Sequence, residues 1–210
     1  MLIEWVMLSS VKLLGRPCIR HEGEWLEPPI GLPSALLYYL AYKQAWVARE
    51  EIAFLFWSDL PEANARRNLR NLVSRVKNLA YIENLEVERN RIHWQIDTDV
   101  AAFKQAVAEN QFEKLISIYK GELLEGFLLD NALEFTEWLE LERTELLQSY
   151  RQAALAYIKD LESQENYSEA ANVLEALRKT DPFDEQLLRH QLKQFQLGGH
   201  YRQALKSFEA

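Results

Sequence analysis

The sequence almost lacks cysteine, and this excludes one way of stabilising a fold. Cys18 is the only cysteine in 210 residues, so no disulfide can form within the chain, which fits a reducing cytoplasm. Long apolar runs are missing too, since Ala35 to Ala41 falls far short of the roughly 20 residues that a membrane span needs. Met1 to Leu14 lacks the basic start and cleavage site of a secretory signal. We therefore expect a cytoplasmic protein with no membrane partner.

Patterns that support catalysis or metal binding are also missing. The histidines are scattered without metal-ligand spacing to the cysteine: His21, His93, His190 and His200. No glycine-rich loop that could hold a phosphate is present. The carboxylates between Glu134 and Glu145 are spread around one predicted helix instead of converging on a site. The sequence therefore predicts no enzyme, with no catalytic residues, no metal ligands and no cofactor.

The net charge of -8 is divided unevenly along the chain. Residues 1–96 contain 12 Lys/Arg and 11 Asp/Glu, a net charge of +1, whereas residues 97–210 contain 12 and 21, a net charge of -9. Within the first half, the segment 63–80 has five basic side chains and no acidic one. A concentration of positive charge on one helix is typical of a surface that binds phosphate.

The first half has the element order of a small sheet, three helices and a hairpin. Apolar segments separated by Gly and Pro predict short strands at 2–8, 11–14, 18–20 and 25–27. Apolar residues at helical spacing predict helices at 33–44, 48–57 and 61–80. Alternating segments at 85–88 and 92–96 flank an Asn-containing turn and predict a β-hairpin. This order predicts a winged helix-turn-helix, whose third helix enters the major groove of DNA and whose wing reaches the backbone or the minor groove.

The third predicted helix has an apolar face and an opposite face that is polar and basic. The apolar positions are Ala65, Leu69, Leu72, Val73, Val76 and Ala80. On the remaining surface, Arg67 and Arg70 are candidates for bidentate bonds to guanine. Asn71 and Asn78 are candidates for hydrogen bonds to adenine, and the small side chain of Ser74 would permit close approach of the helix. The candidates for contacts to phosphate are Arg66, Arg75 and Lys77, and those for contacts from the wing are Arg89 and Arg91.

Almost all of the second half has helical periodicity, and it contains an internal repeat. Four residues recur at an offset of 34 positions: Tyr167, Ala170, Glu175 and Ala176 match Tyr201, Ala204, Glu209 and Ala210. Thirty-four residues is the period of the tetratricopeptide repeat (TPR). Asp181-Pro182 ends one repeat, and a less regular unit runs from Asp99 to Gly121. The last repeat stops inside a helix without a capping signal, which favours a fragment of a longer protein.

An ordered set of segments resembles a known family of regulators. The first half resembles the DNA-binding part of SARP-type (antibiotic regulatory protein) activators at 13–15, 47–51, 55–59, 65–70, 74–75 and 85–88. The second half is similar to their bacterial transcriptional activation domain at 99–103, 119–127, 137–143 and 181–185. The resemblance implies a winged helix that binds direct repeats in promoters, and a helical domain that supports dimerisation and contact with the transcription machinery.

Matched to the family, Arg66, Arg67, Arg70 and Arg75 fall on the DNA-contacting helix, and Arg89 and Arg91 fall on the wing. Ala48 stands where relatives often have a Ser helix cap, which loosens the start of the second helix by about 1 kcal/mol. The charge of +1 on the first half gives less attraction for DNA than many relatives have. The ATPase or further repeat domains of longer relatives are absent, so the sensing step is expected outside this chain.

The sequence thus predicts a mainly α protein with a small β component: a winged helix-turn-helix domain at 1–96 and an all-α, TPR-like domain at 97–210. The first hypothesis is a sequence-specific regulator of transcription, an activator, that binds double-stranded promoter DNA. Its repeats would serve dimerisation, signal relay or contact with RNA polymerase. The alternative is a TPR-type interaction scaffold whose winged helix no longer binds DNA. A third hypothesis is a winged helix that binds RNA, but the sequence lacks the exposed aromatic residues that recognition of single strands usually needs.

Overall fold

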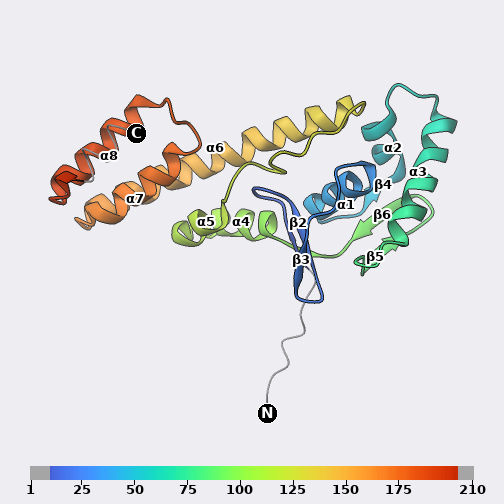
Figure 1. The fold of residues 1–210 in the computed structure, drawn as a ribbon, viewed down its shortest axis with the longest axis horizontal. Helices are drawn as coiled ribbons and strands as arrows, with labels where there is room; N and C mark the ends of the chain where they lie inside the picture. The colour runs from blue at the N-terminus through green and yellow to red at the C-terminus, as the bar shows by residue number, and fades with distance from the viewer. Residues whose placement is uncertain (1–9, 203–210) are drawn as a thin grey trace, which may run out of the picture. The chain divides into compact units, whose positions relative to one another are not determined.

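A computed structural model describes residues 10–202 and contains two compact units, each built from two separate segments of the chain (Figure 1). Of the described residues, the first unit contains 10–104 and 120–144, and the second contains 105–119 and 145–202. The predicted domain boundary at Ile96 stays a prediction, while the compact units divide the chain elsewhere. The strand expected at 2–8 and the repeat positions Ala204, Glu209 and Ala210 lie outside the described residues.

A four-stranded sheet begins the first unit. Its strands lie in the order β3 (Glu24–Leu26), β2 (Cys18–His21), β1 (Ser10–Lys12) and β7 (Asp97–Thr98). Neighbouring strands are antiparallel, except that β1 and β7 are parallel. Gly15, at the turn after β1, has a φ of 89°, a left-handed conformation that glycine adopts without strain. Three of the four predicted strands are therefore confirmed, with ends shifted by one or two residues.

Three helices and a three-stranded sheet complete the predicted winged helix, which is confirmed. The helices are α1 (Leu32–Lys43), α2 (Arg49–Trp57) and α3 (Glu62–Lys77). The sheet has the antiparallel order β4 (Val47–Ala48), β6 (Arg91–Trp94) and β5 (Leu85–Val87), so that β5 and β6 form the predicted hairpin. The expectation that α3 reaches Ala80 and buries it was wrong. Asn78 leaves the helical conformation and caps α3, which leaves Ala80 exposed.

Helix α1 is the centre of the first unit, and every residue from 34 to 42 is buried. It contacts α3 and β6 of the winged helix. Aromatic side chains from later in the chain pack against it as well. Tyr38 meets Phe127 edge-on at 5.6 Å, and Tyr39 meets Trp138 at 4.7 Å between ring centroids. The core of the winged helix is therefore completed by residues that lie beyond position 120.

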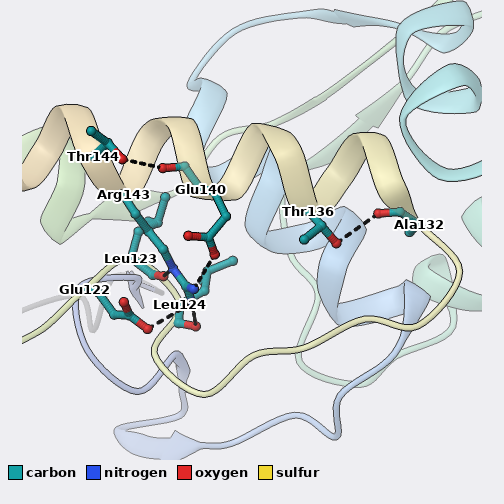
Figure 2. A network of polar contacts seen from close by, with 8 residues as sticks. All are labelled: Glu122, Leu123, Leu124, Ala132, Thr136, Glu140, Arg143 and Thr144. Atoms are coloured by element: carbon teal, nitrogen blue, oxygen red, sulfur yellow. Dashed lines mark hydrogen bonds and ion pairs between the residues drawn. The ribbon is translucent and has the colours of Figure 1, made fainter.

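The second segment of the first unit is a loop followed by the first turns of α6 (Leu133–Ser163). Arg143 on α6 holds this loop, as Figure 2 shows: its Nε and Nη2 atoms donate to the backbone carbonyls of Leu123 and Leu124, each at 2.8 Å. Its remaining contacts are ion pairs with Glu140 and Glu122. Only 13% of the Arg143 side chain is exposed, so this arginine ties the loop to α6 from a largely buried position.

The second unit is entirely helical. Besides the last turn of α4 (Asp99–Ala108) and the rest of α6, it contains α5 (Phe112–Ile118), α7 (Tyr167–Arg178) and α8 (Glu185–Leu197). Helices α7 and α8 pack side by side, in orange and red in Figure 1, with Asp181-Pro182 between them as predicted. Tyr167 is the first residue of α7, and Tyr201 begins the next helical segment, so the 34-residue period sets the helix starts. Within residues 10–202, no helix has both the length and the apolar character of a membrane span.

Candidate nucleic-acid interface

Helix α3 carries the candidate interface on the side away from the core. Its inward face consists of Ala65, Leu69, Leu72, Val73 and Val76, all buried. The candidates on the rest of the helix and just after it are all exposed: Arg66, Arg67, Arg70, Asn71, Ser74, Arg75, Lys77 and Asn78. The two wing candidates Arg89 and Arg91 are exposed as well. The amphipathic pattern therefore places all ten side chains where a ligand can reach them, and their contact with DNA stays a prediction.

Five of these cations have no ion-pair partner among the described residues. They are Arg67, Arg70, Arg75, Lys77 and Arg89. An unpaired guanidinium or ammonium can form a charge-assisted hydrogen bond to an external anion without first losing a carboxylate partner. These five side chains form the part of the surface best able to bind phosphate or the acceptor groups of bases.

Arg66 differs from them because two carboxylates already bind it. Its Nη2 lies 2.5 Å from Glu62, one turn earlier on α3, and 3.6 Å from Glu50 near the start of α2. The arginine thus bridges α2 and α3. Over half of the Arg66 side chain is still exposed, at 54%, so an incoming phosphate would compete with both carboxylates.

Arg91 on the wing is also paired. Its guanidinium bonds to both carboxylate oxygens of Glu88, at 2.7 and 3.1 Å, and lies 4.4 Å from the ring centre of Trp46. The hydrogen bond from Arg91 lowers the pKa of Glu88, so that carboxylate stays charged. The backbone N–H of Glu88 donates to the carbonyl of Arg91, which closes the turn. Arg89 and Asn90 are left at the tip.

A cleft of about 770 Å³ separates the wing from the two helices. It is lined by Arg49, Glu50, Arg66, Leu69, Arg70, Glu88, Arg89 and Asn90. The backbone N–H of Arg49 donates to the carbonyl of Asn90, at 2.9 Å, so the start of α2 is tied to the wing tip. The cleft therefore mixes guanidinium and carboxylate groups.

The small polar candidates lie near the end of α3. Asn78 donates from Nδ2 to the carbonyl of Ser74, at 2.9 Å, and its backbone N–H bonds to the carbonyls of Arg75 and Val76. One amide hydrogen and the amide oxygen of Asn78 are left for a base. Asn71 and Ser74 lie on the exposed side of the helix itself.

Two aromatic side chains, Trp94 and Tyr39, help to hold the elements that carry the interface. Trp94 on β6 is fully buried and donates from Nε1 to the carbonyl of Glu83, at 2.8 Å. Tyr39 on α1 donates to Glu51 on α2, at 2.7 Å, and Lys43 pairs with the same carboxylate. Burial raises the pKa of Tyr39, and the hydrogen bond to Glu51 raises it further. These contacts fix α2 against α1 and the wing sheet in place.

The sequence reasoning missed the carboxylates Glu50, Glu62 and Glu88, which pair with two of the predicted DNA contacts. A signal was available for two of them, because Glu62 is four positions before Arg66 and Glu88 three before Arg91. Within residues 10–202, no three His, Cys, Asp or Glu side chains gather as metal ligands would.

Comparison with known proteins supports the fold of the chain and identifies the family of its second half. A solved structure of EmbR from Mycobacterium tuberculosis, in complex with a low-affinity phosphopeptide, is similar, with a TM-score of 0.61 and 20% sequence identity. The alignment covers 96% of this chain and 58% of that one, so this chain spans little more than half of the solved relative. The family model of the bacterial transcriptional activator domain matches residues 94–210. The comparison with curated proteins gives no match.

Proposed function

The chain belongs to the family of the bacterial transcriptional activator domain, whose members regulate transcription, and from this we propose that its winged helix binds double-stranded promoter DNA in a sequence-specific way. One observation carries the proposal. Four exposed cations on α3 and one at the wing tip have no ion-pair partner among the described residues, and the four on α3 lie outside its buried stripe. An α-helix with its side chains is about 10–12 Å wide, which matches a major groove of about 12 Å.

The proposal gives each side chain a role. Arg67 and Arg70 donate to O6 and N7 of guanine, and Asn71 and Asn78 pair with adenine. Ser74 permits close approach of the helix to the bases. The cations Arg66, Arg75 and Lys77 bind phosphates and fix the register of the helix, while the wing residues Arg89 and Arg91 bind the adjacent backbone or minor groove.

The second half is proposed to act on proteins. Its net charge of -9 repels the DNA backbone, and its α7 and α8 form a paired-helix repeat of the kind that binds other proteins. We propose that it supports dimerisation, relays a signal or contacts RNA polymerase, so that the protein acts as an activator.

DNA binding is tested by a gel shift with duplexes selected from a random pool. Arg67→Ala combined with Arg70→Ala is expected to abolish the selection of a preferred sequence. The matched control is Arg189→Ala combined with Arg202→Ala, which removes two exposed arginines from the second unit and should bind as the wild type does. Equal binding by the two double variants would refute the assignment of α3 as the reading helix.

The alternative, a scaffold whose winged helix binds protein, is favoured by the net charge of only +1 on the first half. It predicts that the protein does not retard DNA in a gel shift even at low salt. It also predicts that the wild type retains a protein partner in a pull-down.

A further inference from the structure

Three carboxylates border the candidate interface, and each belongs to a different element. Glu50 lies near the start of α2, Glu62 in the first turn of α3, and Glu88 directly after β5 in the wing turn. Each pairs with a cation that is proposed to contact DNA: Glu50 and Glu62 bind Arg66, and Glu88 binds Arg91. All three side chains are about half exposed or more, between 46% and 73%, so they face the same solvent as their partners.

The proposed DNA contacts therefore divide into two classes. Arg67, Arg70, Arg75, Lys77 and Arg89 have no ion-pair partner among the described residues, whereas Arg66 and Arg91 are each held by carboxylate. A paired guanidinium presents almost no net charge to a distant phosphate, because the carboxylate in contact with it cancels its charge. Salt screens the remaining field over about 8 Å at physiological ionic strength. The paired class contributes to binding only when a phosphate displaces the carboxylate.

On the basis of the proposed function, we infer that Glu50, Glu62 and Glu88 make Arg66 and Arg91 conditional DNA contacts, which form only where a phosphate displaces the carboxylate. In a complex with the correct sequence, base contacts fix the register, and a phosphate stands close enough to Arg66 and Arg91 to replace their carboxylates. In a complex with any other sequence, the helix lies loosely on hydrated phosphates, and both arginines stay paired.

Non-specific binding depends almost entirely on phosphate attraction. The carboxylates lower it in two ways, since they neutralise two cations and add repulsion at the cleft between α3 and the wing. The specific complex recovers both cations. Because the specific complex must first break each ion pair, the carboxylates lower specific affinity as well, and the two complexes differ in the number of phosphates that the protein neutralises.

The test compares two DNA probes with the full chain. One probe is a random-sequence duplex, and the other is the tightest duplex that the wild type selects from a random pool. Replacing Glu88→Gln is expected to raise affinity for the random duplex about two- to fivefold, the equivalent of one exposed ion pair. It should also steepen the log–log salt slope on that duplex by about 0.9, the value of one added phosphate contact. Affinity for the selected duplex should rise at least as much, because the wild type must break the Glu88–Arg91 pair there, but the salt slope on that duplex should stay unchanged. Glu50→Gln with Glu62→Gln should act in the same way through Arg66.

Two controls make the result specific. Glu24→Gln removes the same charge from β3, which does not line the cleft, and should leave both affinities unchanged. Arg91→Gln added to Glu88→Gln should return binding of the random duplex to the wild-type level, and this holds even if each variant melts at a lower temperature. An equal change in salt slope on both duplexes, no change in slope on the random duplex, or a gain that survives removal of Arg91 would overturn the inference. Failure of the wild type to bind either duplex would refute the proposed function itself, which is seen before any variant is measured.

Discussion

The Nε atom of Arg143 donates to the backbone carbonyl of Leu123 at 2.8 Å, across 20 positions of the chain. The next carbonyl, that of Leu124, is bound by the same guanidinium. Leu124 has a φ of 50°, a conformation that a leucine avoids unless neighbouring contacts hold it. Its N–H donates to the carbonyl of Leu13 at 2.8 Å, so the loop that Arg143 holds also borders the first sheet.

Replacing Arg143→Met should lower the free energy of unfolding by about 1–3 kcal/mol, because two largely buried carbonyls lose a charged donor. Arg143→Lys should recover little of this loss, since an ammonium does not reproduce the planar donor pattern of a guanidinium. Urea denaturation measures both effects. Arg189→Met, at a side chain that is 78% exposed, is the control and should be close to neutral. A similar loss from both arginines would show that the loop contacts add nothing.

Asp184 combines a helix cap and an ion pair, and the two can be separated. Its Oδ1 accepts the N–H groups of Gln186 and Leu187 at the start of α8, and its Oδ2 binds Arg151 at 2.8 Å. Asp184→Asn should keep the cap and lose the ion pair, whereas Asp184→Ala should lose both. We expect the alanine variant to be less stable than the asparagine variant by about 1 kcal/mol, the usual contribution of an N-cap. Equal stabilities in thermal unfolding would contradict the capping role.

The carboxyl of Asp99 should make stability depend on pH. Burial raises its pKa above the ordinary value of 3.8, although the N–H groups of Leu13 and Leu14 oppose the shift. The native state therefore holds this proton to higher pH than the unfolded chain does. The resulting stabilisation is complete below 3.8 and is lost as pH rises through the raised value. Asp99→Asn lacks this change, so the stability of the wild type minus that of the variant should fall over this range in chemical denaturation. A difference that rises with pH would show the opposite shift.

The start of α2 can be strengthened. Ala48 occupies the N-cap position with a φ of -65° and a ψ of 140°, and no side chain caps the helix there. This is the backbone conformation of a capping residue, so Ala48→Ser should stabilise the protein by about 0.5–1 kcal/mol. Ala45→Ser, at an exposed residue before β4, is the matched control and should change stability little. No gain in melting temperature from the serine at 48 would show that its hydroxyl does not reach the helix amides.

Arg75 provides the simplest test of a phosphate contact. It is exposed near the end of α3 and has no ion-pair partner among the described residues. Arg75→Ala should weaken binding to all DNA sequences to a similar extent and reduce the magnitude of the log–log salt slope by about 0.9. Fluorescence anisotropy at several salt concentrations measures the slope. An effect on one sequence alone would instead assign Arg75 to base recognition.

Helix positions and the exposed face of α3 could be predicted because they follow from local periodicity. Leu69 and Val76 repeat at helical spacing, and burying them turns Arg67 and Arg70 outward wherever the helix packs. The error at Ala80 arose from the end of the helix, because Asn78 forms a cap that the apolar pattern did not reveal.

Contacts between distant residues could not be predicted. Asp99 binds the amides of Leu13 and Leu14 across more than 80 positions, and no local pattern indicates which carboxylate will do so. The rings of Phe56 and Phe135, with centroids 5.5 Å apart, also come from residues far apart in the sequence. Such contacts depend on the tertiary fold, which decides that residues beyond 120 cover the winged helix.

This division of the first unit into two stretches of sequence limits how evolution can recombine the protein. A crossover near Ile96 would join one parent's winged helix to another parent's Phe127, Phe135 and Trp138, whose rings must fit Tyr38, Phe56 and Tyr39, respectively. Hybrid regulators made that way should inherit poorly matched cores. Exchange of binding specificity is expected to succeed when residues 120–144 come from the same parent as residues 10–104.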